Sequence, residues 1–156
     1  FGRSNITNKN CLIDRLNTLY NTLELSEWFR LPFADRTTEF NETRTRLLSS
    51  GAVITDIYHL AVNAIREHVP VILIGNHADN QLKPVSDFKK RILMEDLGLA
   101  EFYFETINNS LGQEQVESII NMLISPKFRD TYEKKFENID RKRSNFLATL
   151  VENLTS

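Results

Sequence analysis

The chain predicts an α/β domain, with a mostly parallel sheet flanked by helices, followed by a long C-terminal helix. Two apolar segments of strand length, residues 69–75 and 99–107, alternate with segments of helical periodicity. This alternation is typical of parallel strands joined by right-handed crossover helices. Residues 127–155 keep one apolar stripe at helical spacing along their whole length. We therefore assign residues 1–125 to the α/β domain and residues 126–156 to an amphipathic helix.

Length and composition indicate one globular domain. The 156 residues are 41% apolar and 26% charged, an ordinary balance for a chain that buries a core. A net charge of −2 gives no electrostatic signature for nucleic acid or an anionic membrane, so we expect neither as a partner. The single cysteine, Cys11, excludes an internal disulfide framework and fits a reducing compartment, so we expect a cytoplasmic protein. We expect no direct membrane anchor, because no apolar run reaches membrane-spanning length.

The first part of the chain predicts a helix and a short strand. Residues 10–24 place leucines at helical spacing, with Cys11 on the expected inward side. Residues 24–31 partly alternate between apolar and polar before Pro32, which predicts an edge strand.

A second helix and an ambiguous segment follow. Thr37 or Thr38 is expected to cap a helix that continues through Ser50 and stops at Gly51. Its inward residues are expected to be Phe40, Leu47 and Leu48. Residues 52–68 fit either one helix or a strand over 52–57 that leads into a helix.

The second half predicts the parallel sheet. Residues 69–75 are short, β-branched and apolar on both faces, as in a buried parallel strand. Ser86 is expected to cap a helix that ends at Gly98, with Phe88, Ile92 and Leu93 inward. After the strand at 99–107, Ser110 and Gln113 predict a capping box for a helix with Val116, Ile119, Ile120 and Leu123 inward.

The stripe of residues 127–155 outlasts what a small sheet could cover, and Arg143 interrupts it. Two interpretations stay open for this helix. It packs entirely on the domain, or its last part docks on a partner or on a second copy of the chain.

Residues 76–79 follow the strand at 69–75, at the place where ligands of open α/β sheets bind. A dinuclear metal site is disfavoured, because such a site needs several further His and Asp ligands. An acyltransferase pair is disfavoured as well, because Leu82, and not Asp, stands five residues after His77.

The same segment resembles the guanine-specificity loop of the small GTPases, where Asn-Lys-x-Asp follows such a strand. Here the motif reads Asn-His-Ala-Asp over residues 76–79. Residues 102–124 resemble the family's strand with Glu-Thr-Ser-Ala-Lys and the helix after it. Residues 1–16 resemble the phosphate loop and first helix of the Ras and Rab group. The resemblance covers the chain up to about residue 125 and implies a P-loop, small-GTPase-like fold.

The resemblance implies GTP or GDP with Mg²⁺ as the cofactor, and nucleotide-contacting positions in three loops. These positions are Lys9 at the phosphates, Asn10 as a weak magnesium ligand, Asn76, His77 and Asp79 at the guanine base, and Ile107 and Asn108 at the guanine oxygen.

Each of these loops departs from the family pattern. Gly2 lies seven residues before Lys9, one more than in the family, and Asn8 stands where the second glycine belongs. The nearest counterpart of Asp-x-x-Gly, residues 35–38, lacks the glycine whose N–H senses the γ-phosphate. Asn76 follows Lys9 by only 67 residues. The switch region is therefore deleted or absent from this sequence.

These departures predict a pseudo-GTPase, a protein-interaction or regulatory module of signalling or trafficking that has no catalytic residues and binds a protein partner, with the helix at 127–155 as one site for it. Two alternatives stay open. The chain is a working guanine-nucleotide switch that hydrolyses GTP slowly, or it is an α/β scaffold subunit that binds its partner through the C-terminal helix and has no relation to nucleotides.

Overall fold

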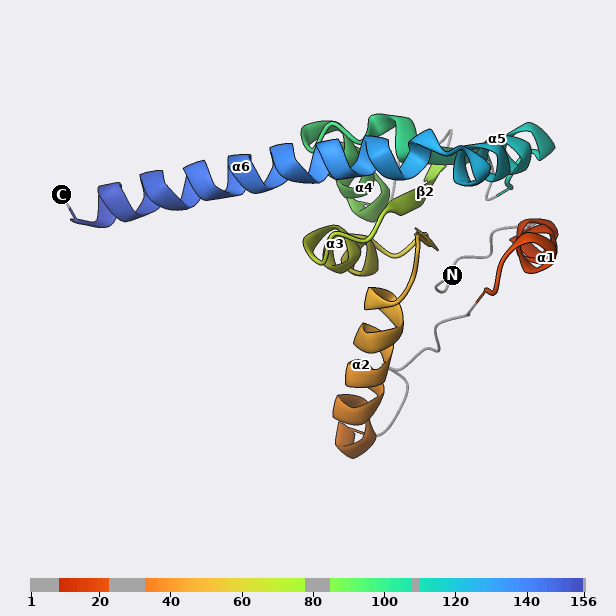
Figure 1. Cartoon of the computed structure of the whole chain (residues 1–156), viewed down its shortest axis with the longest axis horizontal. Helices are drawn as coiled ribbons and strands as arrows, with labels where there is room; N and C mark the ends of the chain where they lie inside the picture. Colours follow the sequence, from red (N-terminus) through yellow and green to blue (C-terminus); the bar gives the residue numbers. More distant parts are fainter. Residues whose placement is uncertain (1–8, 23–32, 78–84, 108–109, 156) are drawn as a thin grey trace.

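The computed structural model describes residues 9–22, 33–77, 85–107 and 110–155 (Figure 1). In chain order the elements are α1 (Lys9–Leu19), α2 (Phe33–Leu48), β1 (Val53–Thr55), α3 (Tyr58–Arg66), β2 (Val71–His77), α4 (Val85–Asp96), the 3-10 helix η2 (Ala100–Phe102), β3 (Tyr103–Ile107), α5 (Gln113–Ile124) and α6 (Lys127–Thr155). The predicted edge strand at 24–31 lies outside the described residues.

Within the described residues the sheet has three parallel strands in the order β1-β2-β3, which confirms the predicted α/β class and parallel pairing. β2 is the central strand, and Val71, Ile72, Leu73 and Ile74 are fully buried, as its apolar sequence predicts. Because crossovers between parallel strands are right-handed, α3 and α4 fall on one face, where they contact each other. α1 contacts α5, and α5 contacts α6, so these helices form a second group.

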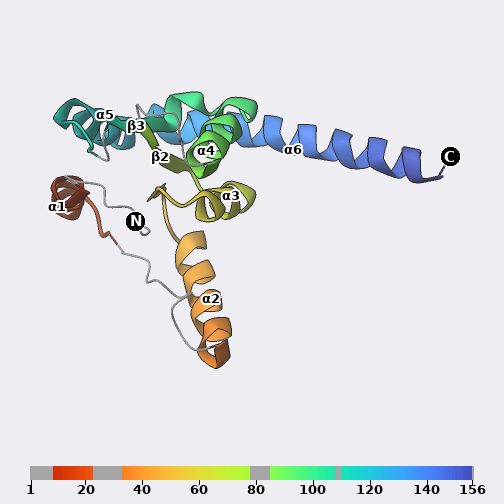
Figure 2. The ribbon, with the colours of Figure 1, turned by 180° about the vertical axis from the view of Figure 1, so that it is seen from behind.

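α6 packs on the sheet by its first half only. Phe128, Tyr132 and Phe136 are buried, and the ring centroid of Tyr132 lies 4.3 Å from that of Phe102. The Tyr132 hydroxyl donates a hydrogen bond to the carbonyl of Val71, the first residue of β2. Beyond this contact region the helix extends away from the other described elements (Figures 1 and 2). Its bounds agree with the predicted helix at 127–155.

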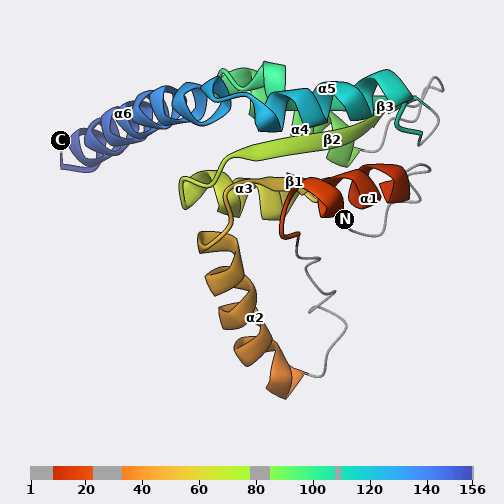
Figure 3. The ribbon, with the colours of Figure 1, turned by 45° about the vertical axis from the view of Figure 1, so that its right-hand side comes forward.

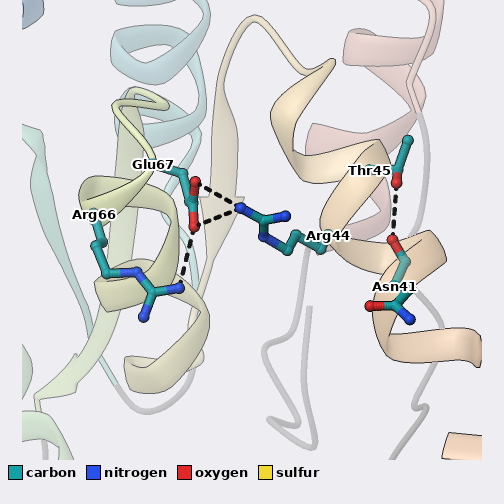
Figure 4. Close-up of polar contacts among 5 residues, drawn as sticks. All are labelled: Asn41, Arg44, Thr45, Arg66 and Glu67. Carbon is teal, nitrogen blue, oxygen red and sulfur yellow. Dashed lines mark hydrogen bonds and ion pairs between the residues drawn. The ribbon is translucent and has the colours of Figure 1, made fainter. Parts of the chain in front are cut away.

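α2 is attached to the domain near its C-terminal end and points away from the sheet (Figure 1). Thr43 and Leu47 are its buried residues among those described. Arg44 of α2 lies 3.3 Å from both carboxylate oxygens of Glu67, which also accepts a hydrogen bond from Arg66 at 3.1 Å (Figure 4). Arg66, and after it Arg44, lowers the pKa of the Glu67 carboxyl below its ordinary value.

Three predictions about α1 and α2 are wrong. Cys11 is exposed, because Leu12 and Leu16 define the buried face of α1 and Cys11 lies about 100° of helical rotation before Leu12. α2 begins at Phe33, ahead of the predicted cap, and Leu48 is 45% exposed. The side chain of Phe40 lies outside the described part.

The ambiguous segment forms β1 and then α3, so the second of the two alternatives is correct. α3 ends at Arg66, and His68 then adopts a left-handed conformation with φ 58°. Its ring stacks on Phe136 with a centroid distance of 5.0 Å. The turn after α3 is therefore held against α6.

Of the three residues predicted to face inward on α4, Leu93 is partly buried against the core and the other two are exposed. Phe88 is 58% exposed and Ile92 is 38% exposed, whereas Asp87, Lys90 and Met94 are buried. Lys90 Nζ donates to Asp87 Oδ1 at 2.6 Å, and this pairing lets two charged side chains lie on the inward face. Gly98, with φ 71°, follows the helix end as predicted.

The start of α5 also differs from the prediction. The helix begins at Gln113 with Gly112 as its N-cap, so the residue that caps from the third position is Gln115. The Gly112 N–H donates to Gln115 Oε1 at 2.9 Å. Val116, Ile119 and Ile120 are buried as predicted, and Leu123 is partly buried.

Candidate functional site

The carboxyl ends of the three strands form the candidate site. β1 ends at Thr55, β2 at His77 and β3 at Ile107. Asn76 pairs in register with Thr106, and His77 pairs with Ile107, so both strands end side by side. α1 and α5 begin at this same end of the sheet (Figure 3). Ligands of parallel α/β sheets bind at such an edge, where helix N-termini also attract anions.

Asn76 and Thr106 interact directly. The Thr106 hydroxyl lies 3.1 Å from the Gly75 carbonyl and 3.2 Å from Asn76 Oδ1. A hydroxyl has one proton, so it donates to one of these two acceptors at a time. Thr106 is fully buried and Asn76 is partly buried. The contact ties the end of β2 to the end of β3.

Gln115 joins α5 to the same edge. Its Nε2 donates to the Glu105 carbonyl at 2.6 Å, while its Oε1 accepts from the N–H of Gly112. The Ser110 N–H donates to the Ile107 carbonyl at 2.9 Å, which brings the chain back after β3. These bonds fix the ends of the loop that follows β3.

Sequence reasoning did not identify Thr106, Gln115, Thr55 or Asp56 as residues of this edge. Thr55 Oγ1 accepts a hydrogen bond from the Ile57 N–H at 3.0 Å, and Asp56 is 8% exposed. The signal for both was a polar pair at the end of an apolar run, Thr-Asp after residues 52–54. No comparable local signal marks Thr106 or Gln115, because their partners are distant in sequence.

The structure places the residues predicted from the resemblance as follows. Asn76, His77 and Ile107 lie together at the edge, and Ile107 is 62% exposed. Lys9 and Asn10 start α1 at the same end, and Asn10 is exposed. Asp79 and Asn108 lie outside the described residues.

Tyr103, the first residue of β3, has its side chain against β2. The Tyr103 hydroxyl is buried and has no hydrogen-bond partner among the described residues. Burial, and then the negative charges of Glu105 and Asp87, raises the pKa of the Tyr103 phenol well above its ordinary value. The phenol is therefore a neutral group. The Tyr103 ring lies against Gly75, where a Cβ atom would come 2.7 Å from Tyr103 Cζ. Gly75 is thus required by this packing.

Within the described ranges no group of three or more His, Cys, Asp or Glu side chains is arranged to hold a metal ion. His59 is exposed on α3, and His68 stacks on α6 with Asp140 Oδ2 at 3.0 Å. At the ends of β2 and β3 the described side chains Asn76 and Thr106 are neutral hydrogen-bonding groups, whereas Asp56, after β1, is a buried carboxylic acid. Asn76 and Thr106 suit recognition of a polar group, because proton transfer needs a titratable side chain.

Comparison with known proteins identifies no relative. No protein-family profile matches the chain, and no curated protein or solved structure matches it significantly. Across the described helices, none combines the length and apolar character needed to cross a membrane.

Proposed function

We propose that this chain is a degenerate member of the small GTPases, a cytoplasmic pseudo-GTPase that acts as a protein-interaction or regulatory module. The observation that carries the proposal is the set of side chains at the carboxyl ends of β2 and β3. Asn76 is engaged by Thr106, and the neighbouring exposed position is Ile107. An isoleucine side chain offers no hydrogen bond to a nucleotide base.

The interval between α1 and β1 supports the same proposal. Small GTPases need strands and switch loops in this interval to sense the γ-phosphate. Here α2 occupies residues 33–48, and the nearest counterpart of Asp-x-x-Gly, residues 35–38, lies within that helix. A helix holds these residues in a different backbone geometry from a loop that follows a strand.

The start of α1 has some of the groups that a phosphate site needs, and these favour the alternative function, a working guanine-nucleotide switch. The N-terminus of α1 lies at the ligand-binding edge, where free N–H groups favour an anion (Figure 3). Asn10, an exposed neutral amide, stands in place of the hydroxyl that coordinates magnesium. Bound nucleotide would have to depend on Lys9 and these N–H groups.

Isothermal titration with GTP and with GDP, each with Mg²⁺, tests the proposal. We expect no affinity tighter than about 10 µM, because both base contacts and phosphate contacts are eroded. Asp79→Ala and Lys9→Ala should then leave the titration unchanged. A sub-micromolar affinity, at or below about 1 µM, that both substitutions abolish would establish the working switch instead.

A further inference from the structure

α6 is anchored to the domain up to a defined point. Lys135 Nζ lies 3.7 Å from Glu101 Oε1, and Asp140 pairs with His68. Lys142 Nζ then donates to the Asp96 carbonyl at 3.2 Å. Among the side chains that the structure describes between residues 143 and 149, Thr149 bonds within α6, to the Asn145 carbonyl, and none bonds another element. The anchored half therefore holds the rest of the helix in a fixed direction.

The apolar stripe continues past these anchors on the same side of the helix. Phe146, Leu150 and Leu154 each follow a buried aromatic residue by 18 residues, which is five turns at about 3.6 residues per turn. The matching residues are Phe128, Tyr132 and Phe136. The later positions consequently fall on the same helical face as these aromatic residues, and the last part of α6 extends beyond the domain (Figure 1).

This orientation argues against a membrane as the partner. An interfacial helix must lay its whole apolar face on a flat lipid surface. Along α6 the first half of that face is already covered by the sheet, and the domain projects from the same side. A flat surface would collide with the domain before it reached residues 146–154. A compact protein fits the corner between the domain and the projecting helix.

The charges argue against a second copy of the chain. Arg141, Lys142 and Arg143 are exposed, and Arg143 lies within the angular range of the stripe. The one acidic residue of 141–155 is Glu152, nine residues after Arg143 and so about 180° away on the helix. Two stripes that face each other would therefore offer Arg143 no carboxylate.

We propose that residues 141–155 of α6 form a recognition helix for an acidic protein that has an apolar, helix-accepting groove, the chemistry of calcium-loaded calmodulin. The spacing of positions 146, 150 and 154 suits the helix-in-groove mode, and the guanidinium groups of Arg141 and Arg143 match a carboxylate rim. The inference rests on the proposed function, because it names the partner class of the interaction module. A helix that is already directed and nucleated by its docked half lowers the ordering cost of binding.

The test is titration of the full chain with calcium-loaded calmodulin at physiological salt. We expect an affinity of about 10 µM or tighter that disappears when calcium is chelated. Leu150→Asp, on the stripe, should weaken binding at least about tenfold, as should reversal of Arg141 and Arg143 to Glu. Asn145→Asp adds the same charge on the opposite, exposed side of the helix and should change the affinity less than about twofold. Circular dichroism should show equal folding of all variants.

Three results would overturn the inference. The first is no binding at about 100 µM calmodulin, or equal weakening by Leu150→Asp and Asn145→Asp, which would indicate non-specific charge attraction. The second is a dimer of the chain alone, seen by sedimentation, that Leu150→Asp dissociates. The third is cosedimentation with phosphatidylcholine vesicles that contain about one third phosphatidylserine, if Leu150→Asp abolishes it.

The nucleotide titration keeps this inference separate from the proposed function. Tight GTP binding with intact calmodulin binding would reject the pseudo-GTPase and leave the recognition helix standing. Weak GTP binding with no calmodulin binding would leave the pseudo-GTPase standing and reject the recognition helix.

Discussion

The substitution Tyr103→Phe should stabilise the protein. The Tyr103 hydroxyl is buried against Gly75 of β2 without a hydrogen-bond partner among the described residues. A polar group that leaves water without gaining a partner costs about 1 to 3 kcal/mol, and Phe removes that group while keeping the ring. We therefore expect the free energy of unfolding to rise by about 1 kcal/mol or more. For a chain of this length, each increase of about 1 kcal/mol in the free energy of unfolding raises Tm by roughly 2 to 4 °C.

Tyr132→Phe is the matched control, because the same atom is removed from a hydroxyl that is bonded. The Tyr132 hydroxyl donates to the carbonyl of Val71, and its loss should lower the free energy of unfolding by about 0.5 to 1.5 kcal/mol. Burial raises the pKa of both phenols, so both stay protonated, and neither difference should vary between about pH 6 and pH 9.

Urea denaturation followed by circular dichroism at 222 nm measures both variants against the wild type. Equal m-values would allow the two midpoints to be compared directly. If Tyr103→Phe destabilised the protein as much as Tyr132→Phe does, the Tyr103 hydroxyl would have a partner. The account of the packing of Tyr103 against Gly75 would then be wrong.

Gly75→Ala should destabilise by about 1 to 3 kcal/mol, because the new Cβ meets the Tyr103 ring, and calorimetry should find a smaller loss in a Tyr103→Ala background. Glu67→Gln should lose stability relative to the wild type above pH 4.5, the ordinary pKa of the carboxyl. Because folding lowers that pKa, the difference should shrink as pH falls further, and denaturant midpoints from about pH 3 to 7 would test this. His68→Gly should be about 1 kcal/mol more stable than His68→Ala, as measured by urea midpoints. Both variants lose the ring that stacks on Phe136, but only glycine adopts the positive φ of this position without strain. The opposite order of stability would contradict the left-handed conformation of His68.

The local pattern of the sequence predicts the elements whose inward residues are apolar. β2 and α6 fall in this class, because β2 is a continuous apolar run that is buried on both faces and the buried aromatic residues of α6 recur at helical spacing. α4 does not, since its inward face contains Asp87 and Lys90, which are buried as a pair. A periodicity argument assigns charged residues to solvent and therefore rotates this helix to the wrong face.

The residues of the candidate site also differ in whether the local sequence predicts them. Asn76 was recognisable because it directly follows a buried strand. Its partner Thr106 is 30 residues away, and only the register between β2 and β3 brings the two together. Register depends on how whole strands and helices pack, so no short motif specifies it. The same reasoning applies to Gln115, which reaches β3 only because α5 returns along the sheet.

The order of the strands has a consequence for synthesis on the ribosome. β1, β2 and β3 are neighbours in the sheet and follow one another in the chain, so each can pair as soon as it leaves the exit tunnel. Tyr132, which bonds Val71 from 61 residues downstream, emerges later. Until then the start of β2 lacks the cover that α6 gives it, and this is the interval in which a chaperone would bind the growing chain.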